Sequence, residues 1–146
     1  MSSIKIVKAR LAYVLQQALP KSTVIYGSGG SEFTDSKRIL VLGGIEKGVT
    51  VLDSMGDETE REEYVIDCQI SVDVVGSDQQ IATELADDDW TVAKRAIRKE
   101  VNGHDLGLHQ PLQVFPTSEF ELREKADTNG RHALIKFGIA VIAQVS

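Results

Sequence analysis

The sequence has little cysteine and no long apolar run. Its one cysteine among 146 residues, Cys68, cannot form an intramolecular disulfide, which excludes a disulfide-stapled scaffold. No apolar stretch approaches the roughly 20 residues that a membrane-spanning helix needs. Residues 1–5 lack the basic patch and unbroken apolar stretch of a secretory signal. We therefore expect a soluble, intracellular protein without a membrane partner.

Positive charge is also scarce. The 16 Lys and Arg residues against 22 Asp and Glu residues give 16 − 22 = −6 at pH 7. Sequence-independent wrapping of duplex DNA requires several cations that neutralise phosphates, so this composition argues against it, although DNA can pass nearby. The length fits one compact domain over 1–146, which at this size buries roughly 70% of the surface of the unfolded chain.

Motifs that carry chemistry are absent as well. The glycine-rich loop 27–32 has Glu32 where a dinucleotide-binding loop has its third glycine, and the chain has no Gly-Lys-Ser/Thr phosphate loop. His104, His109 and His132 are scattered and lack the short spacing of metal ligands. A Gly-x-Ser-x-Gly nucleophile elbow does not occur. We expect no catalytic residues, no cofactor, no metal and no enzyme activity.

Apolar periodicity predicts two helices. Over 4–19 the apolar residues recur every three or four positions, and Pro20 ends the pattern. A second helix is predicted between 77 and 101, where Ser77 and Gln80 form a capping box. Both predicted helices carry one apolar stripe, which is typical of helices that pack on a sheet.

The second predicted helix carries an unusual run of acids before its tryptophan. Asp87, Asp88 and Asp89 point about 100° apart on a helix, so they cannot converge on one metal ion. We expect them to lie on a solvated face, or at a helix kink with a partner nearby. Trp90 lies on the apolar stripe, and we expect it in the core, with a subunit contact as the alternative.

Alternating apolar and polar residues predict the strands. The longest are 64–75 and 131–145, and the shorter ones are 23–26, 38–42, 49–52, 112–115 and 120–122. Pro116 separates the last two, and Asn129-Gly130 marks a hairpin turn. Most connections are too short for a helical crossover. The sequence therefore predicts an α+β fold, a largely antiparallel sheet with an N-terminal helix and one central helix packed on one face.

The two long strands carry much apolar surface. At ~3.3 Å per residue, 131–145 spans about 50 Å, whereas a globule of this length has a radius of gyration near ~15 Å. The strand therefore bends or projects beyond the core. Because a projecting apolar strand exposes its edge and its apolar side chains, we expect a second subunit to cover it.

Charge is unevenly distributed along the chain. The first 21 residues contain four cations and no acid, whereas 53–63 contains six acids against Arg61 alone. We expect a mobile acidic loop over 53–63 and two surfaces of opposite charge that attract each other between copies of the chain. The alternative is a solvated helix face and a mobile loop without a partner.

The order of these elements carries a resemblance. A short helix over 4–19, a strand pair, an acidic loop, the long strand 63–75, a helix carrying 81–87 and 92–97, and a terminal strand 133–141 follow one another. This pattern resembles the small tail terminator proteins of long-tailed bacteriophages and the related tail-completion and neck proteins. The resemblance covers nearly the whole chain and is one of pattern, because no catalytic signature defines the family.

The resemblance implies a virion protein of the tail or neck, assembled in the host cytoplasm. Such a protein forms a hexameric ring on the finished tail tube, stops tube growth and presents a surface for joining to the head. Its implied partners are further copies of itself, the tail tube protein and head-completion or connector proteins. Genomic DNA passes through the ring without sequence-specific binding.

Candidate contact residues come from the residues themselves. An acidic lumen suits the passage of DNA, since like charge keeps DNA from the wall, so we expect Asp57, Glu58 and Glu60 to line it. The candidates for subunit and tube contacts are Arg61, Glu62 and Tyr64 on the long strand, Arg95 and Arg98 on the second helix, and Phe137 on the last strand. Surface charge or core packing is the alternative role for each of them.

Two other functions stay open at this point. A head-closure or connector-side neck protein also forms a ring, and the sequence does not separate it from a terminator. A small dimeric α+β module that binds a metabolite needs a pocket with convergent polar groups. The sequence does not identify such a set of groups.

Overall fold

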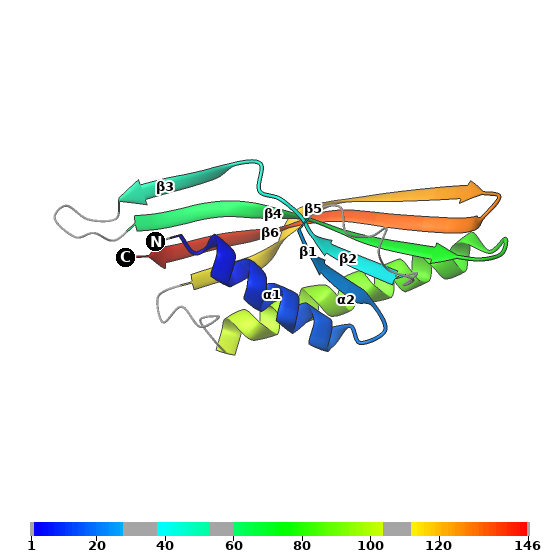
Figure 1. Ribbon diagram of the computed structural model, residues 1–146, viewed down its shortest axis with the longest axis horizontal. Helices are drawn as coiled ribbons and strands as arrows, with labels where there is room; N and C mark the ends of the chain where they lie inside the picture. Colours follow the sequence, from blue (N-terminus) through cyan, green and yellow to red (C-terminus); the bar gives the residue numbers. More distant parts are fainter. Residues whose placement is uncertain (1, 28–37, 53–59, 104–111, 146) are drawn as a thin grey trace.

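A computed structural model describes residues 2–27, 38–52, 60–103 and 112–145 of the chain. The elements are, in order, α1 (Ile4–Ala18), β1 (Thr23–Tyr26), β2 (Arg38–Leu42), β3 (Gly48–Leu52), β4 (Glu60–Val74), α2 (Gln79–Gly103), β5 (Leu112–Asp127) and β6 (Gly130–Val145). Both described helices lie on one face of the sheet, and neither of them covers the opposite face (Figure 1). This arrangement confirms the predicted α+β fold.

The six strands form one sheet, in which five follow the order β1-β2-β4-β6-β5. The sixth strand, β3, pairs with residues 60–64 at the start of β4, whereas β2 pairs with residues 68–72 further along it. β4 and β6 are antiparallel over their whole length, from Glu60 opposite Val145 to Val74 opposite Arg131. β1 and β2 run parallel, and the other described pairs are antiparallel. The two long strands therefore lie in the middle of the sheet, as the sequence predicted.

The start of β4 corrects the predicted acidic loop. Glu60–Glu63 were expected in a mobile segment over 53–63, but they are strand residues. Each has a backbone partner on both sides, since β3 and β6 flank this part of β4. Ladder hydrogen bonds to two neighbours outweigh the low strand preference of Glu. Residues 53–59 lie outside the described residues.

β5 is one strand and not two. Pro116 was expected to separate 112–115 from 120–122, but the strand continues through a register shift between Pro116 and Phe120. A bulge accommodates a proline because the extra residues need no ladder hydrogen bond. Thr117 supplies the missing acceptor, since its Oγ1 accepts a hydrogen bond from the Gly138 N–H at 3.1 Å.

The core lies between the helices and the helix-facing side of the sheet. It consists mainly of alternate residues of β4 and β6 with Val7, Leu11 and Leu15 of α1 and Ala82, Ala86, Trp90, Ala93 and Ile97 of α2. The alanines let α2 approach the sheet closely, and each large buried side chain contributes about 1.5–3 kcal/mol. Neither of the described helices is long and apolar enough to cross a membrane.

Single residues determine the hairpin turn between β5 and β6 and the start of α2. The Gly130 φ angle of 139° suits glycine, and a Cβ there would lie 2.1 Å from the Val74 carbonyl oxygen, so the predicted hairpin turn is confirmed. α2 is capped differently from the prediction. The Asp78 carboxylate accepts a hydrogen bond from the Gln80 N–H at 3.0 Å, whereas the Gln80 side chain donates to Glu84.

Candidate functional site

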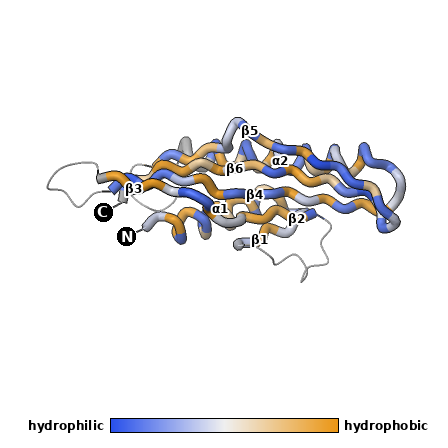
Figure 2. The backbone as a smooth tube through the Cα atoms, turned by 90° about the horizontal axis from the view of Figure 1, so that it is seen from above, coloured by the Kyte–Doolittle hydropathy of each residue, from blue (hydrophilic) through white to orange (hydrophobic). Residues whose placement is uncertain are grey.

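The sheet face opposite the helices carries an apolar patch. We use the name open-face patch for Val49, Val51, Val65, Phe115, Ala140 and Ile142. Strand register places Val65, Ala140 and Phe115 in one row across the sheet. Val49 is 56% exposed and Phe115 is 44% exposed, so the chain itself leaves much of this surface in water. Figure 2 shows β3, β4, β6 and β5 beside one another at the end of the molecule where β4 begins.

A groove lies beside the open-face patch. The β5 bulge places Thr117 over Gly138, where an added Cβ would lie 2.7 Å from Val65 Cγ1 and 3.1 Å from Thr117 Oγ1. The resulting cavity of about 600 Å³ is also lined by Asp67 and Lys136. Its charged groups sit on the outer face of the sheet. Its acidic lining residues Asp67, Glu119 and Glu121 are exposed, so the groove is open to solvent.

Trp90 lies between α2 and the outermost strand. Its ring centroid is 4.3 Å from that of Phe120, and Lys94 Nζ lies 3.8 Å from the indole centroid. The indole is buried, which confirms the predicted core position, but Phe120 is largely exposed. Within the part of the chain that the structure describes, the buried Trp90 N–H has no hydrogen-bond acceptor.

Asp89 corrects the prediction of a fully solvated acidic face. Asp87 and Asp88 are exposed, but Asp89 is only 3% exposed. Arg38 of β2 contacts both oxygens of its carboxylate, with Nε 3.1 Å from Oδ2, and Ser22 Oγ donates a hydrogen bond to Oδ2 at 3.1 Å. This buried ion pair joins α2 to β2 and to the α1–β1 connection. Nothing local to the acidic run indicates it.

The N-terminus of α1 is tied to the start of β4. Ser3 Oγ and Tyr64 Oη are 2.9 Å apart, and the Ser3 N–H donates to Glu62 Oε1 at 2.6 Å. Tyr64 is 5% exposed, and burial raises the pKa of its hydroxyl to about 12. Tyr64 was a candidate for intersubunit contacts. That prediction is wrong for the folded chain, because the ring belongs to the core.

The other predicted contact residues differ in how far they are buried. Phe137 is 6% exposed and packs in the core, so its prediction is also wrong. Glu62 is half-buried and holds Ser3, whereas Arg61 lies 3.1 Å from Glu63 on the open face. Arg95 and Arg98 are exposed on α2 and stay available for contacts.

The predicted lumen residues are described only in part. Glu60 is the first residue of β4 and is half-buried. Asp57 and Glu58 lie outside the described residues, so their predicted place in a lumen stays a prediction.

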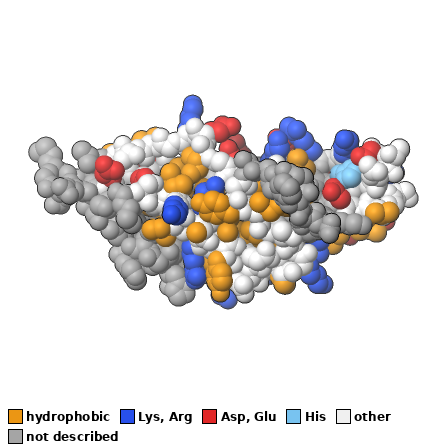
Figure 3. Space-filling model, in the orientation of Figure 1, with side chains coloured by type: hydrophobic (Ala, Val, Ile, Leu, Met, Phe, Trp, Pro, Cys, Tyr) orange, Lys and Arg blue, Asp and Glu red, His pale blue; other side chains and the backbone are white. Residues whose placement is uncertain are grey.

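The basic N-terminal segment is exposed in part. Lys8 is buried, since its Nζ donates a hydrogen bond to the Gly43 carbonyl oxygen at 2.6 Å and lies 4.6 Å from the Tyr26 ring centroid. Lys5 and Arg10 are exposed, and Arg10 stacks on the exposed Tyr13 at 5.1 Å. Figure 3 shows apolar and basic side chains together on this side of the molecule.

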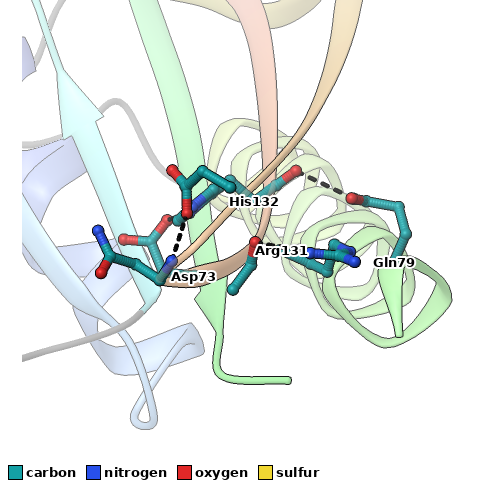
Figure 4. Close-up of polar contacts among 7 residues, drawn as sticks. Asp73, Gln79, Arg131 and His132 are labelled. Carbon is teal, nitrogen blue, oxygen red and sulfur yellow. Dashed lines mark hydrogen bonds and ion pairs between the residues drawn. The ribbon is translucent and has the colours of Figure 1, made fainter. Parts of the chain in front are cut away.

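His132 joins three elements at the far end of the sheet (Figure 4). Its Nδ1 is 2.6 Å from Asp73 of β4, and its Nε2 is 3.0 Å from Asp127 beside the hairpin turn. Gln79 of α2 donates a hydrogen bond to the His132 carbonyl oxygen at 3.0 Å. Hydrogen bonds to Asp127 and then to Asp73 raise the pKa of His132, and the His132 bond lowers the pKa of Asp127. The cluster clamps the tip of the hairpin.

The described residues offer little reactive chemistry. They contain no group of three or more His, Cys, Asp or Glu side chains placed to hold a metal ion. Burial raises the pKa of the Cys68 thiol to about 12, so it is not a thiolate at neutral pH. His104 and His109 lie outside the described residues. The surface features that stand out are therefore the open-face patch, the strand edges and the exposed cations of α2.

Comparisons with known proteins do not assign the chain to a family. No protein-family model matches it, and no curated protein is similar to it in sequence.

Proposed function

We propose that the chain is a structural protein of a long-tailed phage virion, located in the tail or neck. It forms a hexameric ring that caps the tail tube, stops its polymerisation and provides the surface for joining to the head. Its partners are further copies of itself, the tail tube protein and head-completion or connector proteins. The order of elements supports this proposal through its resemblance to tail terminators.

The open-face patch is the observation that carries the proposal. The fold is a helix layer on one face of a sheet, and the other face keeps exposed Val49, Val65 and Phe115. Burying one such side chain completely contributes about 1.5–3 kcal/mol, so side chains exposed by about half each recover about 1 kcal/mol when a neighbour covers them. A chain that works as one of several subunits gains this free energy on assembly.

The charge of the chain fits a ring through which DNA passes. A net charge of −6 disfavours adhesion of DNA to the wall. In this proposal Asp57, Glu58 and Glu60 line the lumen. A ring reconstruction that shows these acids on the outer rim would refute that part.

The test mixes the purified protein with tail tubes assembled from the tube protein of the same phage. Electron microscopy is expected to show a ring at one end of each tube, and capped tubes are expected not to elongate when more tube protein is added. Bare ends that continue to elongate contradict the proposal. Val65→Asp is expected to abolish capping, whereas Val75→Asp, at an exposed valine away from the patch, is expected to retain it.

Two outcomes would favour the other functions. Binding to isolated heads with no effect on tubes indicates a head-closure or connector-side neck protein. A persistent dimer that ignores tubes and is thermally stabilised by a small molecule indicates a metabolite-binding module.

A further inference from the structure

The outer strands of the sheet differ in how their edges are protected. Beside β1, the Gln16 amide occupies backbone groups, because its Nε2 donates to the Ser22 carbonyl oxygen at 2.8 Å and its Oε1 accepts from the Val24 N–H at 3.0 Å. The second half of β5 carries charged side chains, namely Glu119, Glu121, Arg123, Glu124, Lys125 and Asp127. Charges on an edge strand oppose pairing with another chain.

Two stretches of edge lack such protection. β3 reads Gly-Val-Thr-Val-Leu, and residues 112–115 at the start of β5 read Leu-Gln-Val-Phe, so neither contains a charge. Within the described residues β3 pairs only with β4, and this part of β5 pairs only with β6. Among the described residues, the outer backbone donors and acceptors of each stretch therefore have no ladder partner.

These two edges are placed to meet each other in neighbouring copies. They lie at opposite sides of the same level of the sheet, because Thr50, Glu62, Ala143 and Leu112 form one row across it. Three successive antiparallel pairings separate them, so β3 and β5 run in opposite directions. A second copy set beside β5 in the same orientation presents its β3 as an antiparallel neighbour.

The side chains match in this arrangement. Val49 and Val51 of β3 and Phe115 of β5 are exposed, and all three point to the open face. An antiparallel register that sets Val49 opposite Phe115 also sets Thr50 opposite Val114 on the helix-facing side. Cross-strand pairs of aromatic and β-branched side chains are among the favourable ones in sheets.

Charge is complementary beside the same edge. Trp90 and Thr83 mark the side of α2 that faces β5, through contacts with Phe120 and Glu124. Lys94 and Arg98 follow Trp90 at successive intervals of four residues and stay near that side. The start of β4, which lies next to β3, carries acids at 60 and 62 on the helix-facing side of the sheet. A neighbour that docks through β3 brings these acids toward the cations of α2.

We propose that β3 of one copy adds to the 112–115 edge of β5 in the next copy, so that the sheet continues from subunit to subunit. The surfaces joined are different, so the contact is heterologous and repeats until the rotation closes a ring. The ring closure rests on the proposed function, whereas the contact itself can be tested with the isolated protein.

The first experiment is cross-linking with a short bis-maleimide at high protein concentration, with and without tail tubes. A chain with both Val49→Cys and Phe115→Cys is expected to give a ladder of covalent oligomers on a denaturing gel. Each single substitution is expected to give no ladder, because a heterologous contact does not bring identical residues together. Wild type is the control, since Cys68 is buried. Absence of a ladder in both conditions overturns the proposal, and so do dimers formed by a single-cysteine chain.

The second experiment separates this contact from the proposed function. Val49→Lys is expected to abolish the rings on tail tubes, whereas Val75→Lys, at an exposed valine outside both edges, is expected to preserve them. Rings that cap tubes despite Val49→Lys overturn the β3–β5 contact and leave the proposed function standing. A double-cysteine chain that gives the ladder, together with a wild-type chain that never caps a tube, supports the contact and contradicts the proposed function.

Discussion

Replacing Asp89 by alanine is expected to destabilise the fold strongly. Asp89 is 3% exposed and accepts from Arg38 and Ser22, so its removal takes away the carboxylate that pairs with Arg38 and the acceptor of the Ser22 hydroxyl. Breaking a buried ion pair costs about 3–5 kcal/mol. Because the Arg38 side chain is 22% exposed, water solvates it in part, and we expect a loss near the lower end, about 3 kcal/mol. Domains of this kind have a free energy of unfolding of about 5–15 kcal/mol.

The measurement is urea denaturation followed by the fluorescence of Trp90, the single tryptophan of the chain. The matched control is Asp88→Ala, the exposed neighbour on the same helix, which is expected to change the free energy of unfolding by less than about 0.5 kcal/mol. Arg38→Met combined with Asp89→Leu is expected to be less destabilised than Asp89→Ala, since no charge is left uncompensated. Equal effects of Asp89→Ala and Asp88→Ala would refute the assignment of a buried ion pair.

Three further predictions concern other described positions. The pKa of His132 is raised in the folded chain, so the contribution of His132 to stability is complete below its ordinary pKa of 6.5 and is lost as pH rises through the higher folded value. His132→Gln is therefore expected to flatten the pH dependence of the melting temperature in this range. An unchanged profile would contradict the role of His132 in clamping the hairpin. Gly130→Ala is expected to lower the free energy of unfolding by about 1–3 kcal/mol in denaturant titrations, because Gly130 has a positive φ and an added Cβ would collide with the Val74 carbonyl oxygen. The control is Gly44→Ala, which should have less effect because an added Cβ there meets no atom within 4 Å. Cys68 is expected to react with a thiol reagent only after unfolding, and rapid labelling of the native chain would show that its burial is wrong.

Periodicity predicted the parts of the fold that depend on one segment at a time. The alternation along 64–75 and 131–145 identified both long strands, because each has one face on the core. The same alternation places Tyr64 in phase with Ile66, and Phe137 in phase with Ile135 and Ile139. The alternation alone therefore predicts that both side chains are buried, in agreement with their positions in the core.

Features that depend on distant partners were not predictable in this way. The carboxylate of Asp89 looks like its exposed neighbours until Arg38, 51 positions away, is placed beside it. His132 gains its role from Asp73 on another strand and Asp127 across a turn. The charge of residues 60–63 favours a loop locally, whereas β3 and β6 supply ladder partners on both sides and make them strand residues.

The proposed function requires that neighbouring subunits cover the open-face patch. Electron cryomicroscopy of tail-tube ends incubated with the protein tests this most directly. We expect a six-membered ring in which Val49 and Phe115 of adjacent copies lie against each other and are shielded from solvent. Uncapped tube ends, together with a chain that stays monomeric at high concentration with both side chains still exposed, would contradict it.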